Sequence, residues 1–170
     1  KAANLNHLES IYTLAKMYQE GIGTDVDISR AIDLYHKCSE IKDNRVQKYF
    51  LKDKKLITSI RSSIYDYISM NELGLIYITE PNFENKELGF DLIKESGSNG
   101  FLFAKNNYGL ILKFYIKNED KAQNIFNEIS KEIFCLSDFN IGHILEGKGQ
   151  IDESIHFYIK ASDNEDVPLT

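Results

Sequence analysis

The sequence predicts an all-α fold, a solenoid built from helical hairpins, and three observations support this prediction. A pattern of paired amphipathic helices recurs along the 170 residues. A small residue marks the same position in each copy, and glycines stand where the chain must reverse between two helices. The composition, 42% hydrophobic and 27% charged, is that of a chain that folds around a buried core.

The first copy of the pattern is the clearest. Residues 14–23, LAKMYQEGIG, and residues 30–35, RAIDLY, form two amphipathic segments separated by a glycine loop. Weaker copies pair residues 73–77 with 90–93 and 108–112 with 121–126, and a fourth pairs 141–149 with 154–162. The pattern therefore predicts about four hairpins, at residues 7–42, 67–100, 101–132 and 133–165.

The register of the copies is marked by a small residue in each first helix, which would let the second helix cross closely over it. These residues, Ala15, Gly74, Gly109 and Gly142, are 59, 35 and 33 residues apart. The residue before each is expected to fill the core: Leu14, Leu73, Tyr108 and Ile141. Most aromatic residues follow the same register, and we expect them to pack in the core: Tyr18, Tyr35, Tyr77, Phe126, Phe157 and Tyr158.

Two of the loops carry glycine pairs, Gly21 with Gly23 and Gly147 with Gly149. Glycine adopts positive φ at low cost, so these residues are expected to end one helix and turn the chain toward the next.

The first spacing exceeds one repeat by about 23 residues, which predicts a helical insertion at about residues 43–66. Its apolar residues recur at three- and four-residue steps. Lys48, Lys52 and Lys55 belong to the most basic stretch of an otherwise acidic chain. Two interpretations stay open: an ordinary solvated helix face, or a docking patch for an acidic partner.

The first copy resembles the unit of the Sel1-like repeat family, LGxxYxxGxGVxxDxxKAxxWYxKAA, a relative of the tetratricopeptide repeat. The matching residues are Leu14, Tyr18, Gly21, Gly23, Asp27, Ala31, Tyr35 and Lys37. The resemblance implies one domain over residues 1–170, folded as a right-handed α-α superhelix. Because Lys1-Ala2-Ala3 matches the end of a preceding unit, we expect the chain to be a piece of a longer protein.

The resemblance also implies a function, since proteins of this kind hold a protein or peptide on the concave face lined by their first helices. We therefore expect an interaction scaffold or adaptor. The candidate contact residues are Thr13, Lys16, Glu72, Asn107, Asn140 and His143. A second interpretation is that these are ordinary exposed helix residues that contact no partner. The alternative is a regulatory or substrate-recruiting segment of a larger enzyme.

Other function classes find little support in the sequence. A net charge of -6 argues against nucleic acid as the ligand, and no apolar run is long enough to span a membrane. The Gly21-Ile22-Gly23 loop lacks the third glycine of a dinucleotide site, and His143 with Glu146 lacks further metal ligands. We expect no enzymatic activity, cofactor or metal. Cys38 and Cys135 are expected to be buried free thiols, and the cellular compartment stays open.

Overall fold

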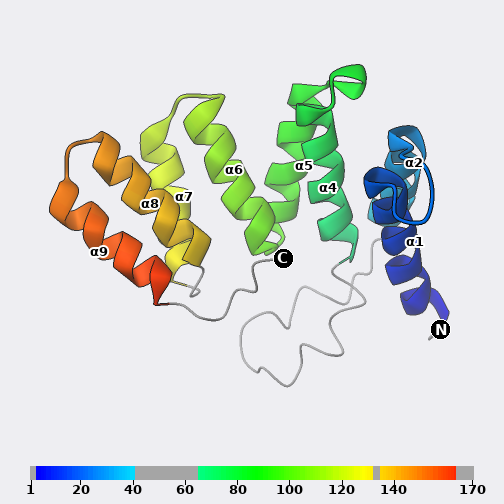
Figure 1. The fold of residues 1–170 in the computed structure, drawn as a ribbon, viewed down its shortest axis with the longest axis horizontal. Coiled ribbons are helices and arrows are strands. Elements are labelled where there is room, and N and C mark those ends of the chain that lie inside the picture. The colour runs from blue at the N-terminus through cyan, green and yellow to red at the C-terminus, as the bar shows by residue number, and fades with distance from the viewer. Residues whose placement is uncertain (1–2, 41–64, 132–134, 164–170) are drawn as a thin grey trace. The chain divides into compact units, whose positions relative to one another are not determined.

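The computed structural model describes residues 3–40, 65–131 and 135–163, and these form eight α-helices, one short 3₁₀ helix and no strand. The chain divides into two compact units, Lys1–Phe101 and Leu102–Thr170 (Figure 1). The predicted insertion at 43–66 lies almost wholly outside the described residues, as does its basic patch of Lys48, Lys52 and Lys55.

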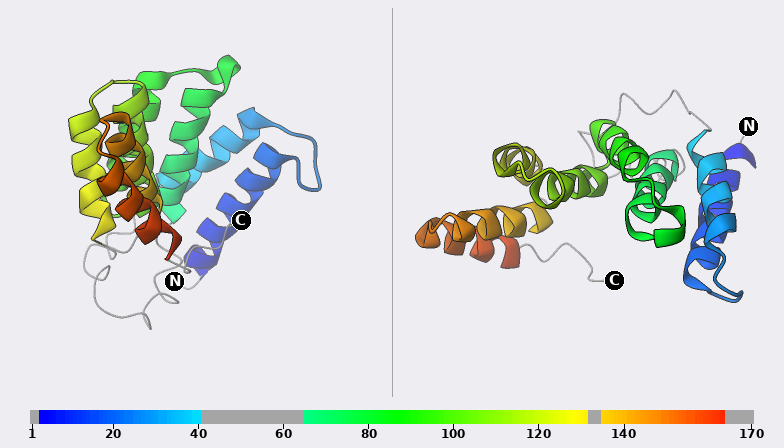
Figure 2. Two further views of the ribbon diagram at one scale, coloured as in Figure 1. Left: turned by 60° about the vertical axis from the view of Figure 1, so that its left-hand side comes forward. Right: turned by 90° about the horizontal axis from the view of Figure 1, so that it is seen from above.

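The first unit contains two helical hairpins. Helix α4 packs against α2 and also touches α1, so the second hairpin lies on the first. Figure 2 shows the antiparallel course of α1 and α2. The elements of this unit are α1 (Ala3–Glu20), α2 (Ile28–Ser39), α4 (Tyr65–Thr79), the 3₁₀ helix η3 (Pro81–Phe83) and α5 (Lys86–Ser98).

The second unit contains two further hairpins, which pack on each other through α7 and α8. Its helices are α6 (Leu102–Phe114), α7 (Glu119–Ser130), α8 (Cys135–Gly147) and α9 (Ile151–Ser162). In every hairpin the first helix (α1, α4, α6 or α8) is followed by an antiparallel second helix (α2, α5, α7 or α9) (Figure 1).

The starts of the second helices are fixed by a recurring polar cap. The side chains of Asp27, Asn85 and Asn118 each accept a hydrogen bond from the backbone N–H three residues later, at 3.0, 3.2 and 3.0 Å. This bond satisfies a donor that has no partner within the helix. Gln150 stands at the same place before α9 but makes no such bond through its side chain.

The small residues that mark the register allow the second helix of each hairpin to cross closely over the first, as predicted. A Cβ added to Gly74 would lie 2.8 Å from the carbonyl oxygen of Gly89, and one added to Gly142 would lie 2.8 Å from the ring of Tyr158. A Cβ at Gly109 would collide with Phe126, and Ala15 is fully buried. The close crossing of the two helices therefore depends on these residues.

The core contains most of the residues that the register placed there. Leu73, Ile141, Tyr35 and Phe126 are buried, and Tyr108 packs against the cluster of the second unit. The aromatic side chains of Tyr18, Tyr77, Phe157 and Tyr158 are half-buried. Cys38 is buried and free, as predicted; the side chain of Cys135 lies outside the described residues.

Two predictions at the level of single residues were wrong. Leu14 is 42% exposed, whereas its equivalent Leu73 packs in the cluster that contains Ile32 and Tyr35 of α2. A residue at this position is buried by the second helix of the preceding hairpin, and within the described residues no such helix precedes α1. Gly147 belongs to helix α8 and does not have positive φ, whereas Gly21, Gly23 and Gly149 do.

Candidate partner-binding site

The first helices of the first unit bring three of the predicted contact residues onto neighbouring surfaces. Thr13 is exposed on α1, where its hydroxyl donates to the carbonyl oxygen of Glu9 at 2.8 Å. Lys16 lies one turn further along α1, and its Nζ is 3.5 Å from Oε2 of Glu72 on α4. The ion pair joins the first helices of two successive hairpins, so it fixes the two side chains relative to each other.

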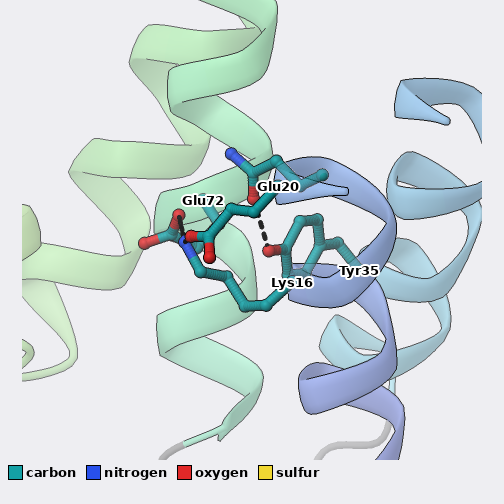
Figure 3. Close-up of polar contacts among 5 residues, drawn as sticks. Lys16, Glu20, Tyr35 and Glu72 are labelled. Atoms are coloured by element: carbon teal, nitrogen blue, oxygen red, sulfur yellow. Dashed lines mark hydrogen bonds and ion pairs between the residues drawn. The ribbon is translucent and has the colours of Figure 1, made fainter. Parts of the chain in front are cut away.

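Lys16 is held by two carboxylates (Figure 3). Besides Glu72 it binds Oε1 of Glu20, one helical turn away, at 2.7 Å. Partial burial alone would lower the pKa of the Lys16 ammonium, but the hydrogen bond to Glu20 and the charge of Glu72 raise the pKa overall. The amine therefore stays charged, and this surface carries one negative charge more than positive.

Two buried or half-buried tyrosines lie beneath this charged group. The Tyr35 hydroxyl donates to Oε1 of Gln19 at 2.6 Å (Figure 3). Burial, with the nearby charge of Glu72, raises the pKa of Tyr12 to about 12 and raises that of Tyr35 as well. Both hydroxyls are neutral at physiological pH, so the charge of this surface comes from Lys16 and its carboxylates.

The second unit holds the other three predicted contact residues. The amide of Asn140 on α8 donates to Oδ1 of Asn106 on α6 at 2.9 Å, which again links two successive first helices. His143 is exposed one turn further along α8, and Asn107 is half-buried on α6. The structure thus pairs Asn140 with a residue that the sequence analysis did not name.

Three residues in or next to the charged group were missed from the sequence: Glu20, Gln19 and Tyr12. Glu20 had a detectable signal, because a lysine and a glutamate four residues apart face each other on a helix. Gln19 and Tyr12 had none, since their partners come from a different helix.

A separate polar cluster joins the three helices α7, α8 and α9. Asp138 is fully buried, and its Oδ1 accepts from the Lys160 ammonium at 2.9 Å and from the Ser130 hydroxyl. The same ammonium donates to Ser130 Oγ at 2.6 Å. A buried carboxylate needs such partners, so the cluster ties the three helices together.

The described part of the chain contains no group of three or more histidine, cysteine, aspartate or glutamate residues placed to hold a metal ion. Within the same residues, no helix combines the length and apolarity that crossing a membrane requires.

Comparison with solved structures reveals the fold. A Sel1 repeat protein from Oxalobacter formigenes superposes with a TM-score of 0.66 over 94% of this chain, at 12% sequence identity. The chain has a Sel1-like repeat fold. MamA is similar with a TM-score of 0.57 over 96% of the chain at 20% identity, and the uropathogenic Escherichia coli antigen c5321, which displays the same type of fold, with 0.51 over 92% at 22%.

These comparisons confirm the predicted all-α fold of Sel1-like helical hairpins. The chain spans 60% of the Oxalobacter formigenes protein, 81% of MamA and 38% of c5321. No protein-family model and no curated protein matches the sequence. The similarity to Sel1-like repeat proteins therefore rests on the three-dimensional arrangement of the helices and on the glycine-marked register of the sequence.

Proposed function

We propose that this Sel1-like chain is an interaction scaffold that binds a protein or peptide through its first helices. The observation that carries the proposal is the Lys16–Glu72 pair, because it fixes polar side chains from two successive hairpins on neighbouring surfaces. A surface that is ordered before binding loses little side-chain freedom when a partner arrives. Thr13 lies on the same helix as Lys16 and is exposed to such a partner.

The charge of this surface indicates the chemistry of the partner. Two carboxylates, Glu20 and Glu72, face the single ammonium of Lys16, which leaves an excess negative charge. Glu9 adds a further exposed carboxylate close to Thr13. A segment that presents lysine or arginine therefore fits this surface better than an acidic segment.

Site-specific photo-cross-linking tests the proposal. A benzophenone amino acid replaces Thr13 on α1, and in a matched control it replaces Lys37, an exposed residue of the second helix α2. After irradiation in a lysate of the source organism, we expect one discrete protein adduct from the Thr13 position and none from Lys37. The same adducts at both positions, or an adduct at Lys37 alone, would contradict binding through the first helices.

A further inference from the structure

Two asparagine side chains meet between the first helices of the second unit. The side-chain amide of Asn140 on α8 donates to Oδ1 of Asn106 on α6 at 2.9 Å. Asn106 is only 5% exposed, and Asn140 is half-buried. Helix α7 packs against both α6 and α8. The pair is therefore held by three helices of one compact unit.

The single hydrogen bond leaves half of this amide pair without a partner. Within the described part of the chain, neither Asn106 Nδ2 nor Asn140 Oδ1 makes a hydrogen bond. The fully buried side-chain atoms that lack a partner there are Ser69 Oγ and Asp138 Oδ2, so the two free amide groups reach the surface. Turning both amides over again leaves one free donor and one free acceptor, because each amide carries both. A largely buried polar group of this kind gains free energy when a ligand supplies the missing partner.

An extended polypeptide offers what the pair lacks. In an extended chain the N–H and the C=O of one residue point to the same side, as they do in the hydrogen-bonded pairs of an antiparallel sheet. The C=O can accept from Asn106 Nδ2 while the N–H donates to Asn140 Oδ1. In an α-helix both groups are instead used by hydrogen bonds inside the helix. The pair therefore selects an extended segment over a helical one.

The surroundings of the pair favour a segment with an apolar side chain. Phe103 lies three residues before Asn106, on the same face of α6, and is 46% exposed. A leucine beside the bound residue would cover part of the Phe103 ring. Because asparagine carries no charge, recognition at the pair does not require a charged segment.

From these observations we propose that the Asn106–Asn140 pair binds the backbone of an extended segment of a partner protein. Two hydrogen bonds join the pair to one residue of that segment, and an apolar neighbour of this residue lies against Phe103. The proposal rests on the scaffold function, since it also assigns binding to the first helices, and it names the kind of segment that the second unit holds. It does not involve the surface around Lys16, so the two can be tested separately.

A short uncharged peptide serves as the probe. The peptide acetyl-Thr-Leu-Thr-Leu-Thr-amide favours an extended conformation, because threonine is β-branched, and it offers leucines to Phe103. It is titrated into the isotopically labelled 170-residue protein, and nitrogen–proton correlation spectra follow the side-chain amides of Asn106 and Asn140. We expect saturable shifts of both signals with millimolar affinity, because a short flexible peptide loses much conformational freedom on binding.

Two controls separate hydrogen bonding to the peptide backbone from other contacts. The same peptide with N-methyl groups in place of its backbone N–H groups should bind about tenfold more weakly, because it cannot donate to Asn140. Asn140→Ala should weaken binding of the unmodified peptide by about tenfold, measured through the Asn106 signal. Asn124→Ala, at an exposed position of the second helix α7, should bind like the parent. Circular dichroism checks that both variants keep their helices.

The proposal fails if the peptide causes no saturable shift of the two amide signals, or if the N-methylated peptide binds equally well. It also fails if Asn140→Ala is less stable than the parent but binds the peptide equally well, because the pair would then only link α6 to α8. Each of these results would leave cross-linking at Thr13 as a separate test of the scaffold function. Peptide binding without an adduct at Thr13 would contradict the site around Lys16 and support the Asn106–Asn140 pair.

Discussion

Replacing Lys160 by methionine should destabilise the second unit, because it removes the cation that pairs with a buried carboxylate. Asp138 has no exposed surface, and the Lys160 ammonium lies 2.9 Å from its Oδ1. Among the described residues, Asp138 Oδ2 has no hydrogen-bond partner. The contacts that offset the burial of this carboxylate are therefore made to Oδ1. The Ser130 hydroxyl also donates to Oδ1, but it carries no charge.

The expected size of the effect follows from burial. Removing one partner of a buried ion pair costs about 3–5 kcal/mol in the free energy of unfolding. Because the Lys160 side chain is 42% exposed, water offsets part of the loss of the ion pair. We therefore expect the free energy of unfolding to fall by about 2 kcal/mol. In a protein of this size, that loss lowers the midpoint of thermal unfolding by roughly 4–8 °C.

A double-mutant cycle distinguishes this cause from a general loss of packing. Ile11 and Met70 occupy the position of Asp138 in the first and second hairpins and are buried. Leucine should therefore fit at position 138 and make the cation unnecessary. The double variant Asp138→Leu with Lys160→Met should unfold in urea within about 1 kcal/mol of the parent. The reasoning fails if Lys160→Met costs less than about 0.5 kcal/mol, or if the double variant is less stable than Lys160→Met alone.

Three further predictions concern other parts of the fold. Gly74→Ala should lower the free energy of unfolding in urea by about 2 kcal/mol, because its Cβ would lie 2.8 Å from the carbonyl oxygen of Gly89. The control Gly147→Ala, also in a helix, should be neutral or stabilising, because its Cβ would have nothing within 4 Å. Equal costs for the two substitutions would refute the packing argument. Gln150→Asp should stabilise α9 by about 1 kcal/mol by supplying the missing cap, and no gain in the midpoint of urea unfolding would contradict this. Burial raises the pKa of Tyr12 to about 12 from 10.0, so Tyr12 ionises at a lower pH in the unfolded chain than in the folded protein. The stability that neutral Tyr12 contributes is therefore fully present below pH 10 and should be lost between pH 10 and 12. Tyr12→Phe should reduce that fall in urea titrations across this range, and an unchanged slope would contradict the assignment.

The hairpin register was the most predictable feature of this chain, because it rests on sterics that each copy satisfies by itself. Gly74, Gly109 and Gly142 each lie under a second helix whose side chains or backbone leave no space for a Cβ. Such a requirement leaves a small residue at a fixed spacing, which one sequence is enough to show. The positive φ of Gly21, Gly23 and Gly149 follows from equally local chemistry.

Features that depend on contacts between side chains of different helices were not predictable. Leu14 and Leu73 stand at the same register position, but only Leu73 has a preceding second helix among the described residues to bury it. The buried Asp138 looks like an ordinary polar residue in the sequence, since its partner Lys160 is 22 residues away on another helix. Lys16 and Glu72 were both predicted as contact residues, but their ion pair could not be predicted without knowing how α4 lies against α1.

The most direct test of the scaffold hypothesis is the affinity of the cross-linked partner, once identified, for three forms of the protein by isothermal titration calorimetry. The forms are the parent, Thr13→Arg on the first helix α1, and Lys37→Glu on the second helix α2, the latter two at exposed positions. We predict that Thr13→Arg weakens binding by about tenfold or more, through bulk and through repulsion of a basic partner, and that Lys37→Glu leaves it unchanged. Equal affinities for all three forms, or a loss confined to Lys37→Glu, would contradict partner binding through the first helices.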